Sequence, residues 1–201
     1  MPTESPHANL RLDLQPAEQQ VIGDLVQRIH RLDVPISSIP VLSSTPSDRS
    51  HKPRPAAVLI PIHFYSTPSI LLTVRSHKLQ HHPGQIAFPG GAAESNDMGP
   101  AATAIREAWE EVGMPESNVT PLGYLDRLDT VSGYRVVPVI AAVRNDYHIK
   151  VDPGEVETVF HLPLAKAMDK AAYSFEQREY KGKRWRLPVL LHDDWRICGA
   201  T

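Results

Sequence analysis

The sequence predicts an α/β protein in which strands and helices surround one sheet. Apolar runs of strand length recur from residue 56 onward, and segments with apolar residues at helical spacing are interspersed among them. The 201 residues are enough to bury a core without disulfide or zinc cross-links. The one cysteine, Cys198, can form no disulfide within the chain. We expect a main domain at residues 55–201, preceded by a helix and a connection at residues 1–54.

The N-terminal part contains one helical pattern. Apolar residues recur at helical spacing between Pro16 and Leu32, which predicts a helix there. Pro16 suits a first helical turn, and Glu18 lies where a carboxylate interacts favourably with the helix dipole. Residues 33–56 are rich in Pro and Ser, so we expect an extended connection without regular elements.

The main domain contains one well-delimited helix among several strands. Pro100 can open this helix, and Gly113 follows Val112 as its expected C-terminal cap. Before the helix, Pro-Gly-Gly at residues 89–91 indicates a tight turn or loop. The other predicted elements are strands at 56–64 and 70–75, a short strand leading into residue 89, strands at 121–130, 134–143 and 156–164, a short helix within 163–173, and strand-like pieces within 185–201.

Composition excludes several classes of function. The net charge of −2 argues against a basic surface for nucleic acid. No apolar run approaches the roughly 18–20 residues of a membrane span, and the polar first residues lack the apolar segment of a signal peptide. We therefore expect a cytoplasmic protein that binds neither nucleic acid nor membrane, and a homodimer is possible.

Three carboxylates on the predicted helix indicate a metal site. Glu107, Glu110 and Glu111 stand at i, i+3 and i+4, so they project from one helical face. Like charges at this spacing cost a few tenths of a kcal/mol each and oppose the dipole near a helix C-terminus. A hard cation such as Mg²⁺, which prefers carboxylate oxygens, removes the conflict, and Arg106 can fork onto one carboxylate and fix its direction. A solvated acidic face would show the same spacing.

The glycine loop followed by this helix resembles the sequence box of the Nudix hydrolases, which reads Gly, five residues, Glu, seven residues, Arg-Glu-apolar-x-Glu-Glu-x-Gly-apolar. Residues 106–114 match every fixed position of its second half. In the first half a one-residue insertion places Asp97 where the family has its first Glu. The resemblance implies an α/β/α sandwich around a mixed sheet, with Mg²⁺ or Mn²⁺ bound by the three glutamates and catalytic roles for Glu110, Glu111 and Arg106.

A second motif resembles the coenzyme A diphosphatase branch of that family. Its three parts are Leu-Leu-Thr-Val-Arg-Ser at residues 71–76, His-Pro-Gly-Gln at 82–85 and Phe-Pro-Gly-Gly at 88–91; Gln80 departs from an expected basic residue. The branch implies cleavage of CoA, a small-molecule nucleotide, or of a CoA derivative to adenosine 3′,5′-bisphosphate and 4′-phosphopantetheine. The alternatives are a Nudix diphosphatase for ADP-ribose or a dinucleoside polyphosphate, and a sensor that binds nucleotide without hydrolysis.

Residues outside the helix complete the expected site. A basic run precedes the glycine loop, where it can meet an anionic substrate, and Arg75 is the expected phosphate contact. The residues expected to bind substrate lie in this run and in the loop: Arg75, Ser76, Lys78, Gly90 and Gly91. Glu155, in a Pro-x-Glu-Val segment similar to one in the family, is the expected general base. Glu111 or another carboxylate of the helix is the alternative base.

Overall fold

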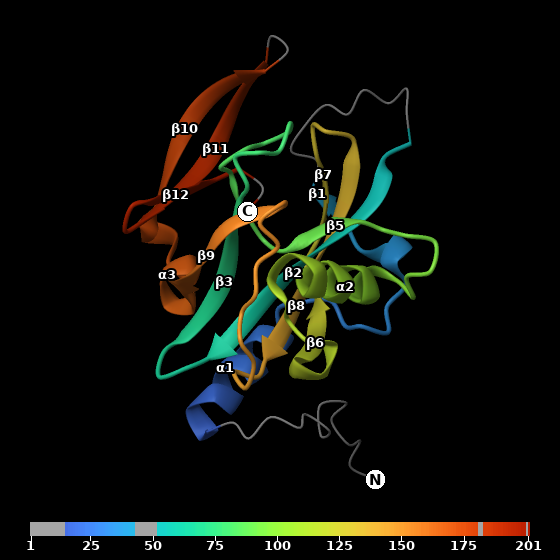
Figure 1. Cartoon of the computed structure of the whole chain (residues 1–201), viewed down its shortest axis with the longest axis vertical. Coiled ribbons are helices and arrows are strands. Elements are labelled where there is room, and N and C mark those ends of the chain that lie inside the picture. Colours follow the sequence, from blue (N-terminus) through green and yellow to red (C-terminus); the bar gives the residue numbers. More distant parts are fainter. Residues whose placement is uncertain (1–14, 43–51, 181–182, 200) are drawn as a thin grey trace.

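The computed structural model describes residues 15–42, 52–180, 183–199 and 201 (Figure 1). Among these residues, nine strands form one sheet and three form a second, smaller sheet. The helices and strands follow one another as α1 Pro16–Val26, β1 Val41–Leu42, β2 Arg54–Phe64, β3 Pro68–Arg75, β4 Ile86–Ala87, β5 Gly90–Ala92, α2 Pro100–Val112, β6 Val119–Tyr124, β7 Arg127–Asp129, β8 Tyr134–Val143, β9 Val156–Pro163, α3 Leu164–Met168, β10 Tyr173–Tyr180, β11 Lys183–His192 and β12 Trp195–Cys198.

The long strand β2 lies at the centre of the larger sheet. It pairs in parallel with β8 along its whole length, from Arg54 opposite Tyr134 to His63 opposite Val143. On its other edge β2 pairs antiparallel with the start of β3 and with the short strand β5. β3 in turn pairs antiparallel with β9 and β4. The combination of parallel and antiparallel pairs is the mixed sheet that the sequence predicts.

Helices cover both faces of this sheet (Figure 1). Neighbouring residues of a strand point to opposite faces, so Leu59 of β2 packs under α2 against Ala108, in one buried cluster. The next residue, Ile60, lies in the cluster on the other face with Ile22 of α1 and Leu164 of α3. The chain is therefore an α/β/α sandwich, which confirms the predicted fold class.

The smaller sheet, β10–β11–β12, extends away from the larger one (Figure 1). Its base is buried where Leu190 and Ile197 pack on Leu72 and Leu162 of β3 and β9. The sequence analysis did not predict β10. This strand consists largely of polar and charged residues over 174–179, so its apolar content gives no strand signal.

Two predictions for the N-terminal part need correction. The helix predicted to reach Leu32 ends at Val26, because the chain then turns so that His30 forms a bridge with Tyr124. The two residues exchange N–H···O bonds of 2.8 Å in both directions, and such tertiary pairing overrides helical spacing. The predicted irregular connection at 33–56 contains strand β1 and the start of β2, while its residues 43–51 lie outside the described part of the chain.

Two predictions in the main domain are also wrong in detail. Gly90 and Gly91, predicted as a tight turn or loop, belong to strand β5, where they pair with Val58 and Ala57. The strand predicted at 121–130 is interrupted, and its two parts are β6 and β7. Both parts pair with β8, at different positions along it.

The helices of the described segments include none that is long and apolar enough to cross a membrane. Strand β2 starts at Arg54. Helix α1 packs on the larger sheet, of which β2 is the central strand. The division into residues 1–54 and 55–201 stays a prediction.

Candidate active site

Strand β5 brings the glycine pair of the motif against α2. A Cβ atom on Gly91 would lie 2.5 Å from Oε1 of Glu107, so a larger residue here would displace that carboxylate. A Cβ atom on Gly90 would lie 2.6 Å from Cα of Val58 and would also collide with the carbonyl oxygen of Ala57. The two glycines therefore allow a close approach between β2, β5 and the catalytic helix.

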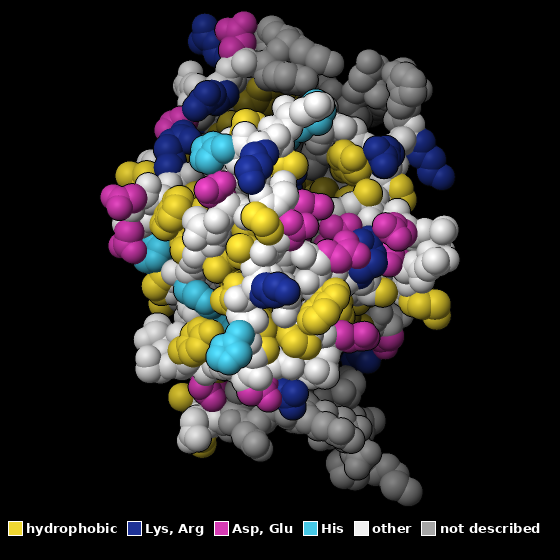
Figure 2. Space-filling model, in the orientation of Figure 1, with side chains coloured by type: hydrophobic (Ala, Val, Ile, Leu, Met, Phe, Trp, Pro, Cys, Tyr) yellow, Lys and Arg dark blue, Asp and Glu magenta, His cyan; other side chains and the backbone are white. Residues whose placement is uncertain are grey.

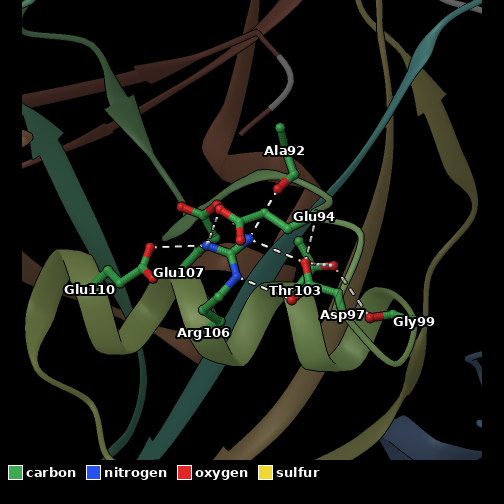
Figure 3. A network of polar contacts seen from close by, with 8 residues as sticks. All are labelled: Ala92, Glu94, Asp97, Gly99, Thr103, Arg106, Glu107 and Glu110. Atoms are coloured by element: carbon green, nitrogen blue, oxygen red, sulfur yellow. Dashed lines mark hydrogen bonds and ion pairs between the residues drawn. The ribbon is translucent and has the colours of Figure 1, made fainter.

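Arg106 holds two of the three predicted metal-binding glutamates (Figure 3). Its Nη2 lies 3.0 Å from Oε1 of Glu107, and its Nη1 donates to Oε2 of Glu110 at 3.0 Å. On the other side of the guanidinium, Nε donates to Oδ1 of Asp97 at 3.1 Å, and Nη2 donates to the carbonyl of Ala92 at 3.1 Å. On the surface, acidic side chains accordingly gather around a basic one over α2 (Figure 2). Arg106 thus fixes the direction of the carboxylates, as the sequence predicted.

Asp97, which takes the place of the first Glu of the family box, points to Arg106. Its Oδ2 also accepts hydrogen bonds of 2.9 Å from the hydroxyl of Thr103 and from the backbone N–H of Glu94. These bonds, with that from Arg106 the largest cause, lower the pKa of Asp97 to about 2. Asp97 therefore anchors the loop before α2 to the arginine that orients the glutamates.

Glu111 is buried in the interior of the site and only 3% exposed. Its Oε2 is buried and has no hydrogen-bond partner in the described part of the chain. Burial raises the pKa of Glu111 to about 8, and the negative charges of Glu155 and Glu107 add to this effect, while Arg75 and the backbone N–H of Gly90 oppose it. Glu107, Glu155 and Arg75 thus lie close enough to Glu111 for their charges to change its pKa.

Glu107 and Glu110 differ in exposure. The side chain of Glu107 is 14% exposed and that of Glu110 is 52% exposed. Burial raises the pKa of Glu107, although the positive charge of Arg106 offsets part of the effect. Glu110 therefore lies at the solvent side of the site, and Glu111 at its base.

Arg75 ends β3 beside the site. Its backbone N–H donates to Gln85 at 2.9 Å and its carbonyl accepts from Gly84 at 3.0 Å, so residues 76–84 form a loop closed at its base. The Nε of Arg75 is buried and has no hydrogen-bond partner within the described segments. Lys78 projects from the same loop with an exposed side chain. The charge of Arg75 acts on Glu111, so Arg75 lies next to the carboxylates, whereas Lys78 lies on the exposed surface of the loop.

Ser76 departs from its predicted role in substrate binding. Its side chain is fully buried, and its hydroxyl donates to the carbonyl of Pro153 at 3.3 Å. Its backbone N–H donates to the carbonyl of Glu155 at 2.8 Å. Ser76 is thus turned away from solvent and joins β3 to the turn that carries Glu155.

That turn is also attached to the end of the catalytic helix, a contact that the sequence analysis missed. The backbone N–H of Asp152 donates to the carbonyl of Glu111 at 3.0 Å, and that of Lys150 donates to the carbonyl of Val112 at 3.0 Å. The helix then ends at Gly113, whose φ of 68° is the left-handed conformation that glycine adopts readily. The signal that could have found the turn was the Asp-Pro-Gly sequence at residues 152–154, typical of a tight turn.

The donor set fits a divalent cation. The unpartnered Oε2 of Glu111 and the repulsion among Glu107, Glu111 and Glu155 are what a bound cation would relieve, and oxygen ligands suit Mg²⁺ and Mn²⁺. Across the described residues, no three acidic, His or Cys side chains stand in a preformed metal-binding group. Arg106 holds an oxygen of Glu107 and one of Glu110, which accounts for this arrangement.

A family model and curated relatives match most of this chain. The family model described as "NUDIX domain" matches residues 52–185. A Nudix hydrolase named NudL from Pectobacterium atrosepticum is 38% identical over 180 residues, covering 90% of this chain and 88% of that protein. NudL from Escherichia coli K12 is 40% identical over 148 residues, covering 74% of this chain and 77% of that protein.

The matches among solved structures are more distant. An Ap4A hydrolase binary complex from C. elegans is 20% identical with a TM-score of 0.48, over 56% of this chain and 83% of that one. The Nudix domain of Shewanella oneidensis NrtR, solved with ADP ribose, is 16% identical with a TM-score of 0.45, over 62% of this chain and 81% of that one. The family model and the NudL proteins carry the assignment: this chain belongs to the Nudix hydrolases, enzymes that cleave diphosphate bonds in derivatives of nucleoside diphosphates and generally use divalent metal ions.

Proposed function

We propose that this Nudix hydrolase cleaves the diphosphate of coenzyme A or of a CoA derivative, giving adenosine 3′,5′-bisphosphate and 4′-phosphopantetheine. The observation that carries the proposal concerns residues 71–91, whose sequence resembles the CoA diphosphatase branch. Arg75 and Gly90, from opposite ends of that motif, both act on the buried carboxylate of Glu111. The branch motif therefore borders directly on the proposed reaction centre.

Glu107, Glu110 and Glu111 would hold Mg²⁺ or Mn²⁺. When bound, the ion supplies charge neutralisation at the diphosphate and lowers the pKa of a coordinated water. Arg106 keeps two of these carboxylates in place through its 3.0 Å contacts. Gly91 carries no Cβ atom that would press on the carboxylate of Glu107, and Gly90 carries none that would collide with β2.

Cationic and basic groups complete the proposed site. Arg75, whose buried Nε lacks a partner among the described residues, would donate to a phosphate oxygen, and Lys78 would meet the anion from the exposed loop. Glu155 is exposed and close enough to Glu111 to raise its pKa. It would accept the proton of the attacking water, with Glu111 as the alternative acceptor.

The proposal implies a cytoplasmic enzyme acting on a small nucleotide. The homodimer expected from the sequence stays a prediction, which the sedimentation coefficient of the purified protein tests. The substrate itself is tested by mass spectrometry of the products formed from CoA in ¹⁸O-labelled water with Mg²⁺ or Mn²⁺. We expect both products, with ¹⁸O in one of them, which also identifies the phosphorus attacked. Turnover of ADP-ribose or of a dinucleoside polyphosphate, with no cleavage of CoA, would overturn the choice of substrate.

A further inference from the structure

Ser76 makes two hydrogen bonds to the turn that carries Glu155. Its hydroxyl donates to the carbonyl of Pro153 and its N–H to the carbonyl of Glu155. The N–H of Asp152 donates to the carbonyl of Glu111, and Val156, directly after Glu155, pairs with Arg75 of β3. The position of the Glu155 backbone is thus set from one side by β3 and from the other by the end of α2.

The hydroxyl of Ser76 serves a second loop as well. It accepts the backbone N–H of Lys78 at 3.4 Å while it donates to Pro153, so donor and acceptor are both in use. The side chain is 0% exposed, so no water can replace either bond without opening the site. Ser76→Ala would remove the partner of the Pro153 carbonyl on the side of the turn that faces the protein, so the turn would be held less firmly.

We propose that Ser76 is a positioning residue, which holds the Glu155 turn at the reaction centre and does not contact the substrate. The inference rests on the proposed function through one point, the role of Glu155 as general base. A general base must lie within hydrogen-bond reach of the water that it activates, and a displacement of about 1 Å can cost on the order of 10²-fold in rate. The hydrogen bond from the hydroxyl of Ser76 to the carbonyl of Pro153 limits such a displacement of the turn.

Ser69 offers a matched control on the same strand. It is 7% exposed, and its hydroxyl makes one buried side-chain hydrogen bond, of 3.2 Å, to Nδ1 of His161. It lies at the opposite end of β3 from Ser76. Ser69→Ala and Ser76→Ala therefore both remove a buried hydroxyl group. Only the hydroxyl of Ser76 is hydrogen-bonded to the turn that carries Glu155.

Steady-state kinetics on each variant, with the nucleotide that the purified enzyme hydrolyses best, tests the proposal. We expect Ser76→Ala to lower kcat about tenfold or more with KM changed less than about twofold, while Ser69→Ala keeps the wild-type kcat. In a Glu155→Gln background, Ser76→Ala should lower kcat no further, because both changes remove the same function. An equal effect of the two serine variants, or an additive loss in the double variant, overturns the proposal.

Hydrogen exchange gives a readout that needs no activity. Ser76→Ala should speed exchange of the backbone amides of residues 152 and 154–156, and Ser69→Ala should leave them as in the wild type. Unchanged exchange in this turn would contradict the role of Ser76 even if CoA proves to be the wrong substrate. A wild-type kcat for Glu155→Gln would instead reject Glu155 as the base, and with it the need for a positioning residue.

Discussion

Replacing Glu111 by glutamine should make the metal-free protein more stable at pH 8 while it abolishes hydrolysis. The perturbation removes a charge and keeps the shape of a side chain that is 3% exposed. The backbone N–H of Gly90, which faces the carboxylate, can donate to the amide oxygen instead. Activity should fall by about 10²-fold or more, because the variant loses a proposed metal ligand.

The size of the stability effect follows from the pKa of Glu111, which burial raises from 4.5 to about 8. As pH rises, Glu111 loses its proton in the unfolded chain before it does so in the folded protein. The stability that protonated Glu111 contributes is therefore fully present below the unfolded-state pKa, and it is lost as the pH rises to the folded-state pKa. At about 1.4 kcal/mol per pKa unit, the loss between pH 5.5 and 8 is on the order of 3 kcal/mol. Glutamine cannot ionise and removes this dependence.

Urea unfolding in the presence of a chelator, at pH 5.5 and pH 8, measures the effect. The difference between the two pH values should be smaller in Glu111→Gln than in the wild type by roughly 3 kcal/mol. Glu157→Gln, an exposed change on β9, should behave as the wild type. Saturating Mg²⁺ should stabilise the wild type at pH 8 and leave Glu111→Gln unaffected. If the wild type and Glu111→Gln lose the same stability between the two pH values, the idea of a buried carboxylate with a raised pKa is wrong.

Three other substitutions have defined outcomes. Gly91→Ala would place a Cβ atom 2.5 Å from Oε1 of Glu107, so kcat should drop roughly 10²-fold and the unfolding free energy by about 1–3 kcal/mol; wild-type kinetics would contradict the close approach. Arg106→Lys keeps the positive charge, but the single amine of lysine cannot bind Asp97 and Glu107 together. The affinity for Mn²⁺, measured calorimetrically, should therefore fall about tenfold. An unchanged affinity would count against the role of Arg106 in orienting the carboxylates. Gly23→Ala, at an exposed position of α1 with nothing within 4 Å, should raise the unfolding free energy by about 1 kcal/mol in urea at constant kcat, and a loss of stability would show hidden strain.

The catalytic helix was predictable because its signals are local. Pro100 and Gly113 mark its ends, and the structure places α2 between them. The central strands were predictable because the larger sheet is covered on both faces, so β2 and β8 read as nearly continuous apolar runs. Helical spacing alone predicts that Glu107, Glu110 and Glu111 share one face of this helix.

The parts that were not predictable depend on contacts distant in sequence. Nothing local shows that Gly90 and Gly91 pair with β2, since glycines before a helix indicate a loop equally well. Ser76 follows Arg75 in one motif, yet the end of β3 buries the serine under a turn about 77 residues later in the chain. The motif therefore contains residues that the structure brings close together, but it does not separate those proposed to meet the ligand from those that hold the neighbouring turn.

The conflict at the end of α2 links stability to function. A helix C-terminus disfavours negative charge, yet three glutamates stand there, and the most buried of them has an oxygen without a partner among the described residues. Arg106 relieves Glu107 and Glu110, but among the described residues Glu111 forms no ion pair with a cationic side chain. The positive charge of Arg75 lowers the pKa of Glu111. The Nε of Arg75 is buried and has no hydrogen-bond partner among the described residues. A cation and a phosphate bound between them would satisfy both the buried Oε2 of Glu111 and the buried Nε of Arg75. On the proposed function, the same residues that weaken the metal-free fold would therefore bind the metal complex of a diphosphate.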